Sequence, residues 1–388
     1  MVLALICALL MPADAGAANS LAGKPCAHAK AVRSVAAVRY VCTKSAGKLV
    51  WRVSAALKPA TFAAQQRDVA ALGNFASPLV PTGYLDIRRA IDAQPEPNTA
   101  NLQFIVDPDI PAAAVDVVNA KIKLVIRIYA STTPALTMPI RIYFYNTKNF
   151  ATLDRLLRAD LSDEALEGGW LDVKLQRALA EPDGFYGGGS AGYGKDGVPV
   201  LFYYLNKHSL TAYDIKQAFA HEFVHVYQRQ IVKNMAPMTC WIREGQATYL
   251  GYGLAADAVA DFRDAWLAQY TWVRTDPSVG DFFGKSESDW LAWLVAQETR
   301  PPTDCDQFSN YLYGSIVWSY LYGTYGADRT NTFFATIAQY PMPTSPPGDA
   351  WKRAFTSVFG EAPAAVYPRI AKYLRAEAVW VNTVVPQR

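Results

Sequence analysis

Apolar and polar residues alternate in three different ways along the chain. Residues 19–57 contain short apolar alternations without a helical period, which predicts a small β-hairpin module. Residues 58–210 combine long segments of helical spacing with strand-like apolar runs, and residues 211–388 are mainly helical between proline-rich loops. The pattern therefore predicts an α+β protein in which a mixed α/β part precedes a helical part.

Four elements of the mixed part can be assigned from this pattern. A spacing of three and four residues between apolar positions predicts helices at Thr61–Leu72 and Ala112–Tyr129. Runs of β-branched and aromatic residues predict strands at Pro139–Tyr145 and Val198–Leu205. The segment Gly187–Gly194 lacks the helix entry and the Lys-Ser/Thr of a phosphate-binding loop, so it is predicted to be a flexible loop beside the cleft.

The N-terminus has the pattern of a signal peptide. An apolar run, Met1–Leu10, leads into Pro12 and the small residues of Ala13–Ala18. The run is much shorter than the roughly 20 residues of a membrane-spanning helix, so no stable membrane insertion is expected. We predict a signal peptide at residues 1–18 and a secreted protein, or one held outside the cytoplasm at the cell envelope.

Cysteine usage agrees with export. Removal of Cys7 with the signal peptide leaves four cysteines, which permit three pairings. We favour Cys26 with Cys42 and Cys240 with Cys305, because each pair then lies within one predicted structural unit. The alternative is four buried free thiols in a cytosolic protein, for which the leader would need another explanation.

Composition narrows the classes of partner. Of the 388 residues, 51% are hydrophobic and 18% are charged, as in an ordinary folded protein. The net charge is only +3, and no run of Lys and Arg is interleaved with aromatic residues. We therefore expect a folded monomer without a nucleic-acid partner. The ten tryptophans would suit glycan binding, but no motif accompanies them and most such rings belong to a core.

The motif that carries chemistry lies on a predicted helix. Thr211 and Asp214 form a capping-box-like start for this helix. The helix contains His221, Glu222 and His225 in an H-E-x-x-H pattern, whose four-residue spacing puts both imidazoles on one face as ligands of one Zn²⁺ ion. Glu222 then lies beside the open position of the metal.

A catalytic zinc site needs a third protein ligand and an open position for water. Glu244, within the segment Trp241–Leu250, supplies a carboxylate. The 18 residues between His225 and Glu244 are enough for a helix end, a turn and an antiparallel return. The sequence therefore predicts His221, His225 and Glu244 as the metal ligands.

These elements resemble the gluzincin zinc peptidases, and most closely the aminopeptidase N family, in which H-E-x-x-H, 18 residues and W-x-N-E-G-x-A-x-Y recur together. In this chain Trp241–Leu250 reads W-I-R-E-G-Q-A-T-Y-L, with Arg243 in place of the Asn. The resemblance covers roughly residues 130–375 and implies a two-lobe catalytic domain at residues 58–388. The G-x-M-E-N element that holds a substrate's free amine in that family is missing, so aminopeptidase activity is not implied.

The resemblance also implies a tyrosine that contacts the reacting carbonyl oxygen. Tyr311-Leu312-Tyr313-Gly314 matches the family's Y-x-x-G element, whose tyrosine hydrogen-bonds the tetrahedral intermediate. By position Tyr311 takes this role, and Tyr313 is the alternative. Because the chain has 22 tyrosines, an aromatic core stripe is the other interpretation of this segment.

We therefore expect a secreted zinc metallopeptidase that acts on peptide or protein substrates. Zn²⁺ would lower the pKa of its water toward about 7, and Glu222 would take the proton as general base and return it to the leaving amine. The alternative is a catalytically inactive or non-peptidase zinc-binding protein that serves as a binding module at the cell surface. A closed structural site would need a fourth protein ligand, for which Cys240 is the one candidate.

Overall fold

The computed structural model describes residues 23–27, 29, 32–35, 38–53, 75–133, 136–180, 187–206, 213–233, 238–273, 280–299, 305, 308–340 and 348–385. The chain divides into two compact units, Met1–Phe62 and Ala63–Arg388. The predicted signal peptide, residues 1–18, and the predicted helix Thr61–Leu72 lie outside the described residues.

The first unit contains an antiparallel sheet in the order β1-β2-β3. Its strands are β1 (Val32–Val35), β2 (Val38–Ser45) and β3 (Lys48–Val53). Ala46 and Gly47 join β2 to β3 with positive φ angles of 48° and 80°, the combination that suits a tight hairpin between twisted strands. A disulfide links Cys26 to Cys42, as predicted. The structure thus contains the predicted disulfide-closed hairpin and adds β1 to it.

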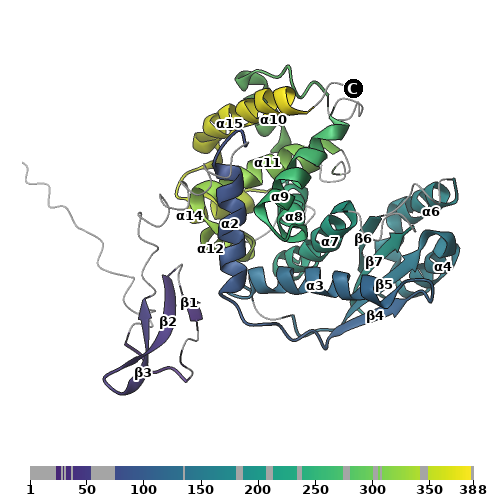
Figure 1. Ribbon diagram of the computed structural model, residues 1–388, viewed down its shortest axis with the longest axis horizontal. Coiled ribbons are helices and arrows are strands. Elements are labelled where there is room, and N and C mark those ends of the chain that lie inside the picture. The colour runs from purple at the N-terminus through teal and green to yellow at the C-terminus, as the bar shows by residue number, and fades with distance from the viewer. Residues whose placement is uncertain are drawn as a thin grey trace, which may run out of the picture. The chain divides into compact units, whose positions relative to one another are not determined.

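The second unit combines a sheet, helices on both faces of that sheet, and a helical part (Figure 1). Its strands are β4 (Leu102–Val106), β5 (Ile140–Asn146), β6 (Gly187–Tyr193) and β7 (Pro199–Leu205). The helices before the last strand are α2 (Leu79–Asp92), α3 (Ala112–Tyr129), α4 (Phe150–Asp160), α5 (Asp163–Leu166) and α6 (Trp170–Ala180). The helices after it are α7 (Tyr213–Val232), α8 (Cys240–Ala255), α9 (Val259–Ala268), α10 (Glu287–Gln297), α11 (Phe308–Tyr325), α12 (Ala327–Thr330), α13 (Phe333–Ile337), α14 (Ala350–Phe359) and α15 (Pro363–Val384). Short 3-10 turns cover Thr147–Asn149, Glu167–Gly169 and Gln269–Trp272.

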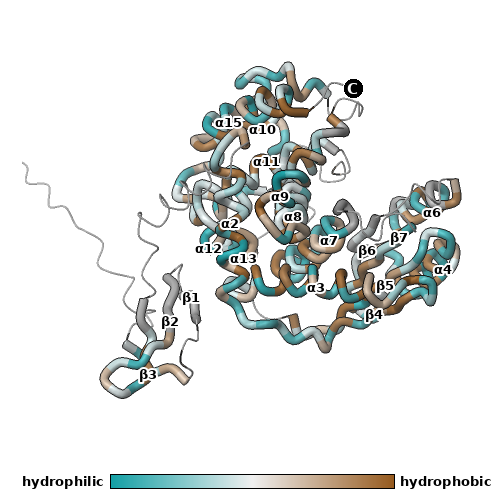
Figure 2. Tube along the Cα trace, in the orientation of Figure 1, coloured by the Kyte–Doolittle hydropathy of each residue, from teal (hydrophilic) through white to brown (hydrophobic). Residues whose placement is uncertain are grey.

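These elements confirm the α+β class and three of the predicted elements. Helix α3 has the predicted bounds, and β5 and β7 match the two predicted strands within one residue at each end. Apolar and polar residues alternate along α3 with helical spacing (Figure 2), so that Val118, Ile122 and Val125 are fully buried. The arrangement specific to gluzincins stays a prediction.

The sheet of the second unit has the strand order β4-β5-β7-β6. Strands β4, β5 and β7 are parallel, and the edge strand β6 is antiparallel to β7. Because side chains alternate across a strand, the paired residues Ile142 and Leu201 belong to a core shared with α3 and α7. The next pair, Tyr143 and Phe202, belongs to a second core shared with α4 and α6. The sheet is therefore covered on both faces.

The prediction of a flexible loop at Gly187–Gly194 is wrong, because Gly187–Tyr193 is strand β6. Aromatic rings of β7 explain the glycines. A side chain at Gly188 would meet the ring of Tyr203 at 2.5 Å, and one at Gly189 would meet the ring of Phe202 at 2.5 Å. The glycines therefore make room for neighbouring rings, a close approach that glycine in a strand often marks.

Helix α11 lies at the centre of the helical part. Nearly all of its residues from Ser309 to Gly323 are buried, which requires packing on every side. Helices α2 and α8 cross it at glycines, with Gly323 against Leu79 and Gly314 against Gly245. One apolar core runs from the sheet through these helices to α15. None of the helices in the described part of the chain is both long and apolar enough to span a membrane.

Candidate metal centre

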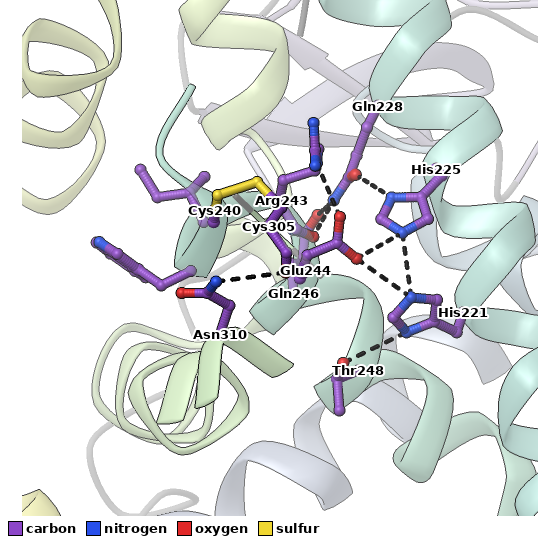
Figure 3. Close-up of polar contacts among 12 residues, drawn as sticks. His221, His225, Gln228, Cys240, Arg243, Glu244, Gln246, Thr248, Cys305 and Asn310 are labelled. Atoms are coloured by element: carbon purple, nitrogen blue, oxygen red, sulfur yellow. Dashed lines mark hydrogen bonds and ion pairs between the residues drawn. A yellow bond between two sulfur atoms is a disulfide. The ribbon is translucent and has the colours of Figure 1, made fainter. Parts of the chain in front are cut away.

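Helix α7 carries both histidines on the side that faces α8 (Figure 3). Its opposite side is fixed to the sheet by Phe219, whose ring packs edge-on against Tyr203 with 4.9 Å between ring centroids. The Tyr203 hydroxyl also donates a hydrogen bond to the Phe219 carbonyl oxygen at 3.0 Å. The apolar face of α7 therefore determines the direction in which His221 and His225 point.

Glu244 lies in the second turn of α8 and points toward the two imidazoles (Figure 3). The start of α8 is fixed by Trp241, which is fully buried, and by Trp318, whose indole N–H donates to the carbonyl oxygen of Ile242 at 3.0 Å. The 18 residues between His225 and Glu244 cover the end of α7, the connection and the first turn of α8. This geometry brings the three predicted ligands together.

The three ligand atoms form a small triangle. The Nε2 atom of His225 lies 3.1 Å from His221 Nε2 and 3.1 Å from Glu244 Oε2, and His221 Nε2 lies 3.5 Å from Glu244 Oε2. Metal–ligand bonds of 2.0–2.1 Å in a tetrahedral site place neighbouring ligands about 3.3–3.4 Å apart. All three side chains are buried, so the triangle has the size, chemistry and shielding that a metal ion requires.

Two side chains orient the imidazoles through their other nitrogen atoms. His225 Nδ1 lies 2.8 Å from Gln228 Oε1, and His221 Nδ1 lies 3.3 Å from Thr248 Oγ1. When each Nδ1–H donates to its oxygen partner, the lone pair of each Nε2 is left for a metal. Both partners therefore favour the tautomer that a ligand needs.

Arg243 holds the carboxylate of Glu244 on the side away from the triangle. Its Nε–H donates to Glu244 Oε1 at 2.8 Å, while Oε2 faces the histidines. Burial alone raises the pKa of the Glu244 carboxyl, but the charges of His225 and Arg243 outweigh burial and hold this pKa well below its usual range. Arg243, the residue that replaces the expected Asn, thus adds to the effect of His225 in keeping Glu244 ionised.

Glu222 is half-buried and adjacent in sequence to the predicted ligand His221. Burial raises the pKa of the Tyr203 phenol, and the negative charge of Glu222 raises this pKa further. Glu222 also interacts with the charge of Arg229, which lies seven residues later on the same line of α7. The predicted general base therefore lies on the same side of α7 as Arg229, two helical turns before it.

The two candidate tyrosines have different surroundings. The ring of Tyr311 is stacked on the His221 imidazole, with 5.7 Å between ring centroids and 20° between ring planes. Tyr313 is fully buried between Trp290 and Trp293, with ring centroids at 4.7 and 5.2 Å. Tyr311 is thus the one of the pair that contacts a predicted ligand, and Tyr313 belongs to the aromatic core.

A buried chain of hydrogen bonds extends from the triangle into the fold. Gln228 Nε2 donates to Gln246 Oε1 at 3.1 Å, and the same oxygen accepts from the Tyr129 hydroxyl at 2.9 Å. The sequence could have indicated Gln228 and Thr248, because they follow His225 and Glu244 at helical spacings of three and four. Nothing in the sequence pairs Gln246 with Tyr129, which is 117 residues away.

Cys240 cannot act as a thiolate ligand, because it forms a disulfide with Cys305 (Figure 3). The bond joins the start of α8 to a residue just before α11, with 5.0 Å between the Cα atoms. This pairing was the predicted one. Of the described residues, only His221, His225 and Glu244 converge as a group that could hold a metal ion, which leaves a three-ligand site.

Comparisons with models of protein families, with curated proteins and with solved structures found no match. What this chain does is therefore inferred from its own residues.

Proposed function

We propose that the chain is a zinc-dependent peptidase of the gluzincin type that hydrolyses peptide or protein substrates. The observation that carries the proposal is the buried triangle of His221, His225 and Glu244, with Glu222 next to one of these ligands on α7. Two imidazoles and one carboxylate form the protein ligand set of hydrolytic zinc sites, which keep a further position for water.

Each side chain has one task in the proposed reaction. Zinc, when bound, supplies a Lewis acid that makes water more acidic and polarises a carbonyl group. A carboxylate oxygen of Glu222 accepts a proton from the attacking water and returns it to the amine nitrogen as the C–N bond breaks. The Tyr311 hydroxyl donates a hydrogen bond to the carbonyl oxygen, which gains negative charge. Gln228 and Thr248 keep both imidazoles oriented.

Two features favour hydrolysis over other functions of such a site. Two histidines and a carboxylate also form the ligand set of non-haem iron oxygenases, but those sites need no adjacent general base. A structural zinc site would be closed by a fourth protein ligand, but the disulfide of Cys240 removes that thiol, and in the described part of the chain only His221, His225 and Glu244 converge. Glu222 would have no task in a binding module without catalysis.

The proposed site of action is outside the cytoplasm. Disulfides such as Cys26–Cys42 and Cys240–Cys305 are typical of proteins from oxidising compartments. Together with the signal-peptide pattern of residues 1–18, they support a secreted protein or one held at the cell envelope.

The experiment compares the wild-type protein with Glu222→Gln, which keeps the shape of the side chain and removes the base. Zinc content is measured for both proteins, and both are incubated with a peptide library. We expect equal zinc and a fall in hydrolysis by about two to four orders of magnitude. Glu287→Gln, at an exposed glutamate of α10, is the matched control and should behave as wild type. No cleavage by zinc-loaded wild type, or equal cleavage by Glu222→Gln, would contradict the proposal.

A further inference from the structure

The small net charge of the chain hides a strong asymmetry between its two units. Met1–Phe62 contains eight of the 37 lysines and arginines but only one of the 34 acidic residues, Asp14. Its net charge is therefore +7, which leaves −4 for Ala63–Arg388. So large an excess of positive charge in a small unit favours binding to an anionic partner. It says nothing about how the unit folds.

Residues 15–62 contain no carboxylate side chain that could neutralise these cations. Because Asp and Glu are both absent from this segment, ion pairs inside the module are excluded by composition. Like charges in a small unit repel one another, and this cost is relieved when an anionic partner binds. The cations of this segment are Lys24, Lys30, Arg33, Arg39, Lys44, Lys48, Arg52 and Lys58.

The cations lie on more than one side of the module. Lys44 and Lys48 flank the turn between β2 and β3, and both are exposed. Lys48 is paired with Ser45, the neighbour of Lys44 in β2, so Lys44 and Lys48 point to opposite faces of the sheet. Lys24 is also exposed, and its carbonyl oxygen accepts from the Trp51 backbone N–H on the other edge of β3.

We propose that this cationic module, residues 23–53, binds a flexible single-chain polyanion that carries phosphate groups along its length. A flat membrane surface can approach only one face of the sheet at a time, and a rigid duplex has the same restriction. A flexible chain can follow the cations around both faces. The large hydrophobic side chains that are exposed in the described residues all lie between Val173 and Val384, so the described module offers no apolar anchor for a bilayer.

The test uses the full-length mature protein and long-chain inorganic polyphosphate as the probe. Affinity is measured by calorimetry over a series of salt concentrations. The triple variant Lys24→Gln, Lys44→Gln, Lys48→Gln should bind at least about tenfold more weakly at low salt. The slope of log K against log salt should decrease by about two, because each lost phosphate contact contributes about 0.7.

A matched triple variant controls for charge removal elsewhere. Lys148, Lys233 and Lys372 are exposed lysines of the second unit, and their replacement by Gln should leave binding unchanged. Equal weakening by both triples, or no binding by wild type, would overturn the proposal. Tighter binding to vesicles of phosphatidylglycerol and phosphatidylcholine, or to duplex DNA, would also overturn it. Glu222→Gln should bind polyphosphate as wild type does, so this result is independent of the peptidase proposal.

Discussion

Gly245 lies against Gly314 where α8 crosses α11, so that a side chain on Gly245 would lie 2.5 Å from the Cα atom of Gly314. Gly245 directly follows the proposed ligand Glu244, and Gly314 lies one turn after Tyr311. The two glycines therefore let the backbones approach closely enough for both segments to reach His221. This contact gives a packing reason for the glycine that comes one residue after Glu244 and the glycine that comes three residues after Tyr311.

Alanine at Gly245 or Gly314 should separate the two helices. We expect each substitution to lower the free energy of unfolding by about 1–3 kcal/mol, as overpacking does, and to weaken zinc retention by displacing Glu244. Gly253→Ala on the same helix is the control, because its new methyl group would meet Tyr84 at an ordinary 3.7 Å. That variant should be stabilised by about 0.5–1 kcal/mol in denaturant unfolding. Equal stability of the Gly245 and Gly253 variants would contradict the packing argument.

Tyr311→Phe should remove one hydrogen bond to the reacting carbonyl oxygen without emptying the site. The expected result is a loss of about 10²–10³ in kcat with little change in KM, measured on a peptide that the wild-type protein cleaves. Tyr313→Phe, in the aromatic core, is the control and should retain activity. If the Tyr313 variant carries the defect instead, the register of the Y-x-x-G element is shifted by two residues. If neither variant is impaired, another group donates this hydrogen bond.

Gln228→Met should lower zinc affinity while all three ligands remain. The substitution keeps the approximate shape of the side chain but removes the acceptor of His225 Nδ1–H. Loss of such an orienting partner typically weakens metal binding about 10- to 100-fold, which chelator competition would measure. The control is Gln230→Met, two residues further along α7, which changes a half-buried glutamine whose Nε2 lies 3.5 Å from the Tyr193 hydroxyl. Affinities that do not differ between these two variants would show that Gln228 does not orient the ligand.

Glu377 should make stability depend on pH. Burial raises the pKa of this carboxyl to about 7, although hydrogen bonds from Trp266 and Tyr270 at 2.7 and 3.0 Å lower it. Because this value lies above the ordinary 4.5, the folded state keeps a proton that the unfolded state loses between pH 4.5 and 7. The contribution of Glu377 to the free energy of unfolding is therefore fully present below pH 4.5 and is lost as the pH rises through 7, a change of about 3 kcal/mol.

Glu377→Gln tests this linkage, because an amide cannot ionise. We expect the variant to gain about 3 kcal/mol relative to wild type between pH 4.5 and pH 8, measured by urea unfolding. A difference between the two proteins that stays constant over this range would show that Glu377 has an ordinary pKa in the folded state.

The candidate ligands could be predicted from the sequence because their spacing follows local helix geometry. His221 and His225 are one turn apart on any helix, and the 18 residues between His225 and Glu244 equal the spacing of the gluzincin motif that the sequence resembles. Helix geometry also allowed the helix Ala112–Tyr129 to be predicted, because its buried positions recur every three or four residues.

The elements that were missed depend on contacts with distant residues. Strand β6 contains glycines that weaken a strand in isolation, and only the rings of Tyr203 and Phe202 show why they are needed. Helix α2 contains Gly83, against which Tyr249 and Tyr322 pack. Such contacts have no local signal, so sequence periodicity could not reveal them.

The metal content of the purified protein tests the central claim most directly. Mass spectrometry of dialysed protein should find one zinc ion per chain in the wild type. His221→Ala, His225→Ala and Glu244→Ala should each lose most of it, because each removes one of three protein ligands. The double variant Cys240→Ser, Cys305→Ser should retain zinc. It should be less stable than wild type, because the disulfide that it lacks closes a long loop and stabilises the folded state by about 4 kcal/mol. Wild-type protein that holds iron, or no metal, would contradict the proposed zinc centre.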